Sequence, residues 1–218
     1  ACGKRGIPHR RTGKLIVATN AAEEEALQAL LGKAHANGVD DMLMLSGRVV
    51  RSLEPEVVAT AGLLSPSTGI IDSHGLMRAL LVAAAGNGVT TAFRSRVTAA
   101  RYDGVRYELE INGGESLVAS RTVVNSAGLQ SDRVAALPGI DVDLEGYRLK
   151  LCKGSYFFAS PAPPIRHLVY PTPTPRHEGL GVHATLDLGG RVRFGPDVEY
   201  VDAVDYRVDE ARRDAFHE

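Results

Sequence analysis

The chain has 218 residues, of which 44% are hydrophobic and 23% are charged, a composition typical of a globular protein with one large or two interleaved domains. The formal net charge of −1 gives no indication of a nucleic-acid partner or an anionic membrane. Cys2 and Cys152 form no CxxC motif, which argues against a disulfide framework and a cysteine zinc site. Apolar runs are too short to cross a bilayer, so no transmembrane segment is expected.

The first part of the chain predicts alternating strands and helices. Gly13–Thr19 is a compact apolar strand, and Asn20 followed by Glu23 has capping-box spacing at the start of a helix that Asn37 and Gly38 end. We expect further elements at Met42–Leu45 (strand), Ser46–Leu53 (one helical turn) and Val57–Leu64 (extended segment).

A helix over His74–Ala85 is apolar nearly all round, which predicts that it is largely buried. After this helix the pattern changes to strands separated by short turns. Asn112-Gly113-Gly114 favours a hairpin, so a β-ribbon is expected. The expected strands are Val89–Phe93, Arg96–Tyr102, Gly104–Ile111 and Leu117–Ala119.

The ribbon leads into a stretch that can approach a ligand. Thr122–Asn125 is predicted as a short buried strand, followed by the small residues Ser126, Ala127 and Gly128 and by a helix over Leu129–Leu137. Small residues between a strand and a helix let a ligand come close to backbone N–H groups. An ordinary strand–helix turn explains the same residues equally well.

The last part of the chain predicts strands without intervening helices, as in an antiparallel substrate-binding sheet. We therefore expect a mixed α+β and α/β fold, in which an antiparallel-sheet domain (residues 1–72 and 143–218) is interleaved with part of a nucleotide-binding domain (residues 73–142). The expected late strands are Arg148–Ala159, Leu168–Tyr170, Gly179–Leu186 and Arg191–Phe194.

Gly179–Ala184 matches the letters GxGxxA, but we reject it as a dinucleotide loop. Such a loop follows an apolar strand and opens a helix, whereas this segment is predicted to be a strand. The sequence offers no other phosphate-binding glycine loop.

Two histidines and one lysine are candidates for chemistry. His183, flanked by small residues on the polar side of an alternating strand, can act as a general base because imidazole titrates near neutral pH. Lys153 can bind a carboxylate, with Tyr170 as a second donor, although a solvated lysine is the simpler interpretation. For His74 a capping role is favoured. The histidine spacings predict no metal site.

Several stretches together resemble the flavin-dependent oxidoreductases of the D-amino-acid oxidase superfamily, and most of all their L-2-hydroxyglutarate dehydrogenase and oxidase branch. Their order and spacing are more specific than any one of them, and they extend from residue 13 to residue 197. They are Gly13–Thr19, Ser65–Asp72, Val123–Leu129, Lys153–Phe157, Leu168–Pro171, Gly179–Thr185 and Phe194–Asp197.

The resemblance implies a Rossmann-like, ribbon-containing FAD domain, and it implies roles for particular residues. Val97, Ser126, Ala127 and Gly128 would contact FAD, and His183 would be the catalytic base. A small 2-hydroxy acid, L-2-hydroxyglutarate in the first instance, would give a hydride to FAD. The residues expected near this substrate are Lys153, Tyr156, Tyr170 and His74.

The family pattern also includes an early GxGxxG strand and a late glycine-rich segment, and this sequence contains neither. We therefore expect an internal part of such an enzyme, which alone is inactive and binds FAD poorly or not at all. Exposed apolar surface would favour self-association. The expected location is the cytoplasm, with peripheral membrane contact as the alternative.

Two other hypotheses remain open. A sister enzyme on the same fold would act on an amine, an amino acid or glycerol 3-phosphate. A non-catalytic binding module would have kept the sheet and lost the cofactor.

Overall fold

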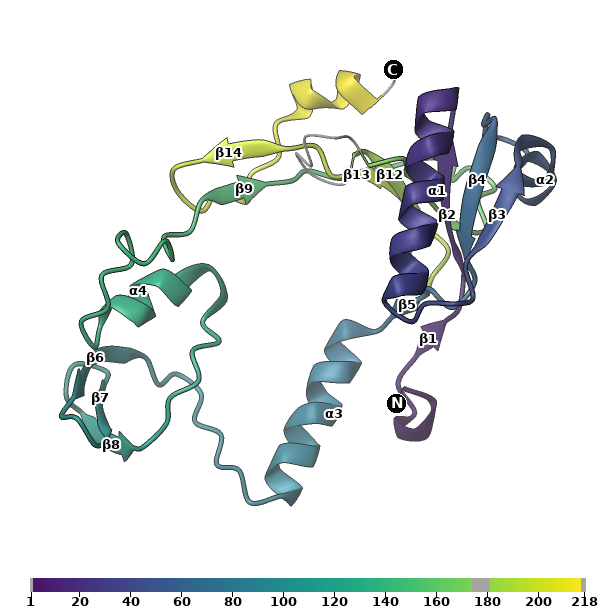
Figure 1. Cartoon of the computed structure of the whole chain (residues 1–218). Coiled ribbons are helices and arrows are strands. Elements are labelled where there is room, and N and C mark those ends of the chain that lie inside the picture. Colours follow the sequence, from purple (N-terminus) through teal and green to yellow (C-terminus); the bar gives the residue numbers. More distant parts are fainter. Residues whose placement is uncertain (1, 174–180, 217–218) are drawn as a thin grey trace. The chain divides into compact units, whose positions relative to one another are not determined.

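The computed structural model describes residues 2–173 and 181–216 and has a mixed α/β fold with antiparallel and mixed sheets. Contacts divide the chain into two units (Figure 1). Unit 1 comprises Ala1–Ala83, Lys153–Glu199 and Asp205–Glu218, and unit 2 comprises Ala84–Cys152 and Tyr200–Val204. The contact boundaries after residues 83 and 152 therefore lie beyond the sequence-based boundaries at 72 and 142.

Unit 1 is built on a seven-stranded sheet with the strand order β10–β13–β12–β11–β2–β4–β3. β11 pairs in parallel with β2 and antiparallel with β12, so segments far apart in the sequence become neighbours. The strands are β2 (Lys14–Ala18), β3 (Leu43–Ser46), β4 (Ala61–Ser65), β10 (Phe157–Phe158), β11 (Leu168–Pro171), β12 (His183–Leu186) and β13 (Val192–Gly195).

Helix α1 (Ala21–Ala36) packs against β2 and β4 through an apolar stripe that includes Leu27, Leu30 and Leu31 (Figure 1). Its predicted N-cap is confirmed, because the Asn20 side chain accepts a hydrogen bond from the Glu23 N–H at 3.1 Å. The Glu23 carboxylate reaches back one residue further than in a capping box and accepts from the Thr19 N–H at 2.7 Å. Leu27 is fully buried in the core beneath the helix. Local sequence signals therefore specify this helix and the face it buries.

A buried carboxylate joins the short helix α2 (Gly47–Leu53) to the segment before β11. Glu54, only 1% exposed, ends α2 as expected before Pro55. Its Oε1 accepts hydrogen bonds from the His167 N–H at 2.7 Å and the Arg166 N–H at 2.9 Å, and lies 2.6 Å from His167 Nδ1. The Glu54 carboxylate thus satisfies the backbone donors that lead into β11.

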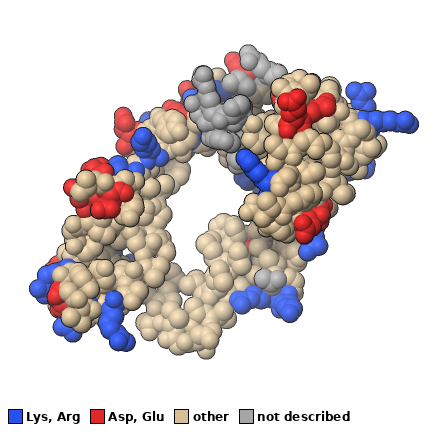
Figure 2. Space-filling model, viewed as in Figure 1, with Lys and Arg blue, Asp and Glu red and all other residues tan. Residues whose placement is uncertain are grey.

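Unit 1 also contains the two-stranded sheet of β1 (His9–Arg10) and β5 (Ile70–Ile71) and the 3-10 helices η1 (Gly3–Arg5) and η3 (Glu210–Phe216). On the face shown in Figure 2, basic and acidic side chains are scattered among uncharged residues, in keeping with the net charge of −1.

Helix α3 (Ser73–Gly86) forms as predicted, but its expected burial is wrong. None of its residues is buried, and Leu80 and Val82 are 53% and 74% exposed. A helix that is apolar all round is buried only when other layers cover it, and no described helix or strand packs extensively against α3.

No helix in the described residues is long and apolar enough to span a bilayer. The self-association of the chain through exposed apolar surface stays a prediction.

Unit 2 contains the expected β-ribbon, formed by the antiparallel strands β6 (Val97–Tyr102), β7 (Tyr107–Ile111) and β8 (Ser116–Ser120). It is followed by the 3-10 helix η2 (Gly128–Gln130) and the helix α4 (Ser131–Ala136), within the predicted helical stretch.

Three expected strands differ from the structure. Val89–Phe93 and Thr122–Asn125 are unpaired, and Val124 is 82% exposed, because no described strand lies beside them to complete a ladder. Arg148–Ala159 is split into β9 (Leu151–Lys153) and β10, because the Ser155 N–H donates to the Asp197 carboxylate at 2.7 Å.

β9 pairs with β14 (Glu199–Val201) where the chain passes between the units. The strand predicted over Gly179–Leu186 corresponds to β12, which begins at His183. Gly179 and Leu180 lie outside the described residues.

We predict that Glu54→Gln destabilises the protein by roughly 1–3 kcal/mol, because a neutral amide oxygen forms weaker hydrogen bonds with the Arg166 and His167 N–H groups than a charged carboxylate does, and the amide NH2 cannot accept the second contact of the Arg166 N–H. Urea unfolding of the full-length protein would measure the change in the free energy of unfolding. Glu56→Gln is the matched control, since Glu56 is exposed and its substitution should have little effect. Equal unfolding midpoints for the two variants would contradict the role of Glu54.

Candidate active site

His183 begins β12 and is only 5% exposed. Its Nδ1 lies 3.0 Å from the carbonyl oxygen of Gly181. A carbonyl oxygen can only accept, so in this hydrogen bond Nδ1 carries the proton and Nε2 of the neutral ring presents a lone pair. The imidazole can therefore accept a further proton at Nε2.

Two tyrosines pack against this imidazole. Tyr170 stacks on His183 with ring centroids 3.9 Å apart and an interplanar angle of 14°. The register explains this contact, because Val169 pairs with Ala184 in an antiparallel ladder and the next residue of β11 therefore lies opposite His183. Tyr156 approaches edge-on, with centroids 6.2 Å apart and an angle of 81°.

A cation lies over each tyrosine ring. The Lys14 Nζ is 5.4 Å from the centroid of Tyr170, and the Arg193 guanidinium carbon is 4.8 Å from the centroid of Tyr156. Arg193 pairs with Thr185, which lies two residues after His183 on the same face of β12. We call these five residues (Lys14, Tyr170, His183, Tyr156 and Arg193) the cation–aromatic cluster. All of them belong to unit 1.

Burial and charge both favour a neutral His183. Burial is the main cause that lowers the pKa of this imidazole below its ordinary value, and the charges of Arg193 and Lys14 lower it further. The hydrogen bond to the Gly181 backbone acts in the opposite direction and is outweighed. Burial also raises the pKa of the Tyr170 phenol, so this side chain remains neutral. The cluster thus holds a neutral base between two positive charges.

Gly195 provides the space that Tyr156 needs. Its φ of +141° favours glycine, and a Cβ at this position would lie 2.5 Å from the Ser155 carbonyl oxygen and 2.7 Å from Cδ1 of Tyr156. Because Gly195 pairs with His183 across the ladder, the close approach of the backbone occurs beside the imidazole.

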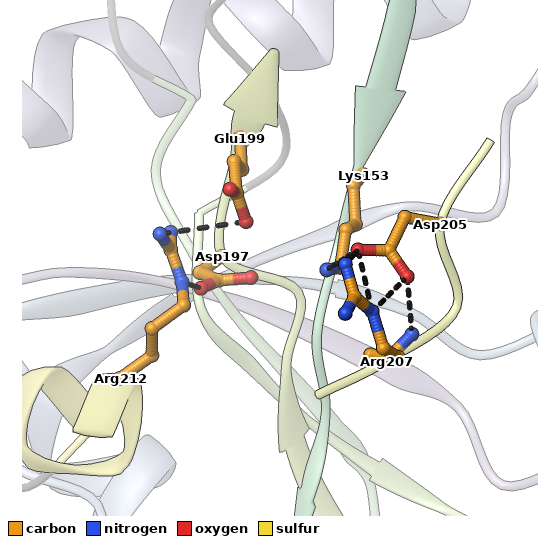
Figure 3. Close-up of polar contacts among 6 residues, drawn as sticks. All are labelled: Lys153, Asp197, Glu199, Asp205, Arg207 and Arg212. Atoms are coloured by element: carbon orange, nitrogen blue, oxygen red, sulfur yellow. Dashed lines mark hydrogen bonds and ion pairs between the residues drawn. The ribbon is translucent and has the colours of Figure 1, made fainter. Parts of the chain in front are cut away.

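Two of the residues predicted near the substrate make other contacts. Lys153 Nζ lies 3.8 Å from a carboxylate oxygen of Asp205, and Arg207 binds the same carboxylate through two nitrogens (Figure 3). The Arg207 side chain is the main cause that lowers the pKa of Asp205, so Lys153 faces a carboxylate that stays ionised. His74 is exposed in the first turn of α3, and within the described residues it makes no hydrogen bond or ion pair. The structure thus brings His183, Tyr170 and Tyr156 together, without a described contact from Lys153 or His74.

Beside Lys153, a second ion-pair group includes Asp197, whose other carboxylate oxygen binds Arg212 (Figure 3). Arg212 also lies 3.5 Å from Glu199. Since Asp197 accepts the Ser155 N–H, these charges stabilise the backbone just before Tyr156.

The residues that the resemblance assigns to FAD lie in unit 2. Val97 begins β6 and lines an apolar cavity of about 140 Å³ together with Asn125. Gly128 begins η2 with a φ of +56°, and a Cβ there would meet nothing within 4 Å. Ser126 and Ala127 precede it, and the Ala127 N–H donates to the Asn125 side chain at 3.2 Å. Of these four residues only Val97 lines the cavity, which is smaller than the usual ligand pocket of about 300–1,000 Å³, so their contact with FAD stays a prediction.

An open cavity of about 890 Å³ also lies in unit 2, where Arg133, Arg148 and Lys150 contribute positive charge. Arg148 is neutralised by Asp143 at 2.6 Å and Asp132 at 3.7 Å. All residues lining this cavity belong to unit 2, whereas the cation–aromatic cluster belongs to unit 1. We take the cluster as the candidate active site, because among the described residues it is where a buried neutral imidazole lies near two cations without an acidic partner. Nowhere in residues 2–173 and 181–216 do three or more potential metal ligands converge.

Sequence reasoning missed Lys14 and Arg193. Each had a visible signal, because Lys14 is the only charged residue in β2 and Arg193 is the only charged residue in β13. The signal is weak, because Arg193 is exposed and Lys14 is half-buried, and only a fully buried charge requires a partner.

The comparisons with known proteins bear on this site. The family described as FAD dependent oxidoreductase matches residues 2–218. The chain belongs to this family. Within it, the chain is 33% identical to the mitochondrial L-2-hydroxyglutarate dehydrogenase of Arabidopsis thaliana, over 99% of the chain and 53% of the relative. It is 34% identical to the Caenorhabditis elegans enzyme of the same name, over 89% of the chain and 45% of the relative.

Among solved structures, this FAD-dependent oxidoreductase chain is similar to the L-α-glycerophosphate oxidase of Mycoplasma pneumoniae with FAD bound. The TM-score is 0.77 with 26% identity, over 91% of the chain and 52% of the oxidase. The chain spans about half the length of these relatives.

We predict that His183 titrates below pH 6.5 and that Arg193→Gln raises its pKa without restoring the ordinary value, because burial and Lys14 still disfavour the charged ring. NMR titration of the imidazole protons would measure both values. Arg191→Gln is the matched control, since Arg191 is already paired with Asp187 at 2.7 Å. An unchanged His183 pKa in Arg193→Gln would refute the electrostatic link.

Proposed function

We propose that the full-length protein oxidises an L-2-hydroxy acid, with L-2-hydroxyglutarate as the leading substrate. The observation that supports this most directly is a buried, neutral His183 whose Nε2 is free to accept a proton. Membership in the FAD-dependent oxidoreductases and the names of the plant and nematode relatives support the same reaction.

His183 Nε2 would take the proton of the substrate hydroxyl. The Gly181 carbonyl holds the Nδ1 proton, so the ring accepts at one defined atom. Tyr170 covers one face of the imidazole and Tyr156 packs at its edge, so the two rings restrict the ring plane and shield that face from water. Bound FAD would supply the hydride acceptor. A cytoplasmic location belongs to this proposal, with peripheral membrane contact as the alternative.

A second candidate substrate is glycerol 3-phosphate, because a solved structure with 26% identity is an L-α-glycerophosphate oxidase. This substrate also loses a proton from a hydroxyl and a hydride from carbon, so His183 could serve either reaction. Anaerobic mixing of the flavin-loaded full-length protein with each substrate separates the two, since only the true substrate bleaches the flavin absorbance.

We predict that His183→Ala lowers kcat by about 10²–10⁴-fold, the usual contribution of a positioned general base. Steady-state kinetics of the full-length protein, normalised to flavin content, would measure the loss. His35→Ala is the control, because His35 is exposed in the last turn of α1 and should leave kcat unchanged. A kcat near the wild-type value in His183→Ala would rule out His183 as the base.

A further inference from the structure

Lys14 and Arg193 are cations without an acidic partner in the described chain, and both lie beside a buried imidazole. In residues 2–173 and 181–216 neither side chain makes a hydrogen bond or an ion pair, and each faces an aromatic ring. Nearby, by contrast, Arg191 is paired with Asp187 and Lys153 with Asp205. Unpaired cations beside a buried base repel its protonated form and attract anions.

The order of groups in the cation–aromatic cluster is charge, ring, imidazole, ring, charge. Lys14 lies over Tyr170, which stacks on His183, and Arg193 lies over Tyr156, which packs at the edge of His183. In the strand order β13–β12–β11–β2, the strand of His183 lies between those of Arg193 and Lys14. The base thus lies between two positive charges that come from different strands of the sheet, β2 and β13.

We infer that Lys14 and Arg193 are substrate-binding residues that select a 2-hydroxy dicarboxylate by holding one carboxylate each. In such a molecule the hydroxyl-bearing carbon lies between two carboxylates, just as His183 lies between two cations. The guanidinium of Arg193 can bind a carboxylate through two nitrogens, whereas the ammonium of Lys14 acts as a point charge. This inference rests on the proposed function and names the residues that decide its substrate class.

Other substrate classes match this arrangement less well. Glycerol 3-phosphate carries its charge at one end only, which leaves one of the two cations without an anion. An amino acid brings an ammonium group next to the reacting carbon, between two cations that repel it. A monocarboxylate such as 2-hydroxybutyrate engages one cation.

Binding of glutarate, a dicarboxylate without a reacting hydroxyl, tests the inference without turnover. Calorimetry on the flavin-loaded full-length protein should show glutarate binding at least about tenfold more tightly than butyrate. Lys14→Gln and Arg193→Gln should each weaken glutarate binding about tenfold or more, and only one of them should weaken butyrate binding. Arg193→Lys, which keeps the charge but loses the two-nitrogen contact, should weaken glutarate binding less than Arg193→Gln does, and Arg191→Gln should leave it unchanged.

Equal affinities of the wild-type protein for glutarate and butyrate would overturn the inference, as would glutarate binding that neither variant changes. The experiments distinguish a failure of the proposed oxidation from a failure of the dicarboxylate-binding assignment. If glutarate binds as expected but no 2-hydroxy acid bleaches the flavin, the proposed oxidation is wrong and the dicarboxylate site stands. If L-2-hydroxyglutarate bleaches the flavin and both variants keep the wild-type KM ratio between it and 2-hydroxybutyrate, the assignment of Lys14 and Arg193 is wrong.

Discussion

The pairing of β11 between β2 and β12 is the constraint on which the cation–aromatic cluster depends. A slip of one residue would turn Tyr170 to the opposite face of the sheet and away from His183. Two devices oppose such a slip. Before β11, the Glu54 carboxylate holds the backbone of Arg166 and His167. After it, Thr172 donates to the Val17 carbonyl through its backbone N–H at 3.1 Å and its hydroxyl at 2.8 Å.

This anchoring explains how a polar ring can be nearly fully buried in the sheet. Burying an imidazole costs free energy unless its polar atoms are satisfied, and His183 satisfies Nδ1 locally through the Gly181 carbonyl, two residues earlier. In the part of the chain that the structure describes, Nε2 makes no hydrogen bond and remains for chemistry. The close approach of backbone at Gly195 then admits Tyr156 at the ring edge, so aromatic surface replaces water around the base.

Sequence reasoning succeeded where the determining contacts are local. The N-cap of α1 at Asn20 is such a local feature, and it forms. The alternation expected around His183 does not form, because His183, Ala184 and Leu186 are all buried and Val182 is 38% exposed, so sequence reasoning was wrong there. It failed where a second layer or a distant strand decides. The burial of α3 requires covering elements that the described residues do not supply. Lys14 comes next to Tyr170 only through a parallel pairing of strands about 150 residues apart, which no local pattern reveals.

The two cations also connect substrate binding to the reactivity of the base. Burial is the main cause that lowers the pKa of His183, and the charges of Arg193 and Lys14 lower it further, which keeps Nε2 unprotonated but makes it a weak proton acceptor. On the proposed function, a bound dicarboxylate would neutralise both charges and remove the repulsion between them and an imidazolium ring. The pKa of His183 would then rise in the complex, where the base would have to take the hydroxyl proton.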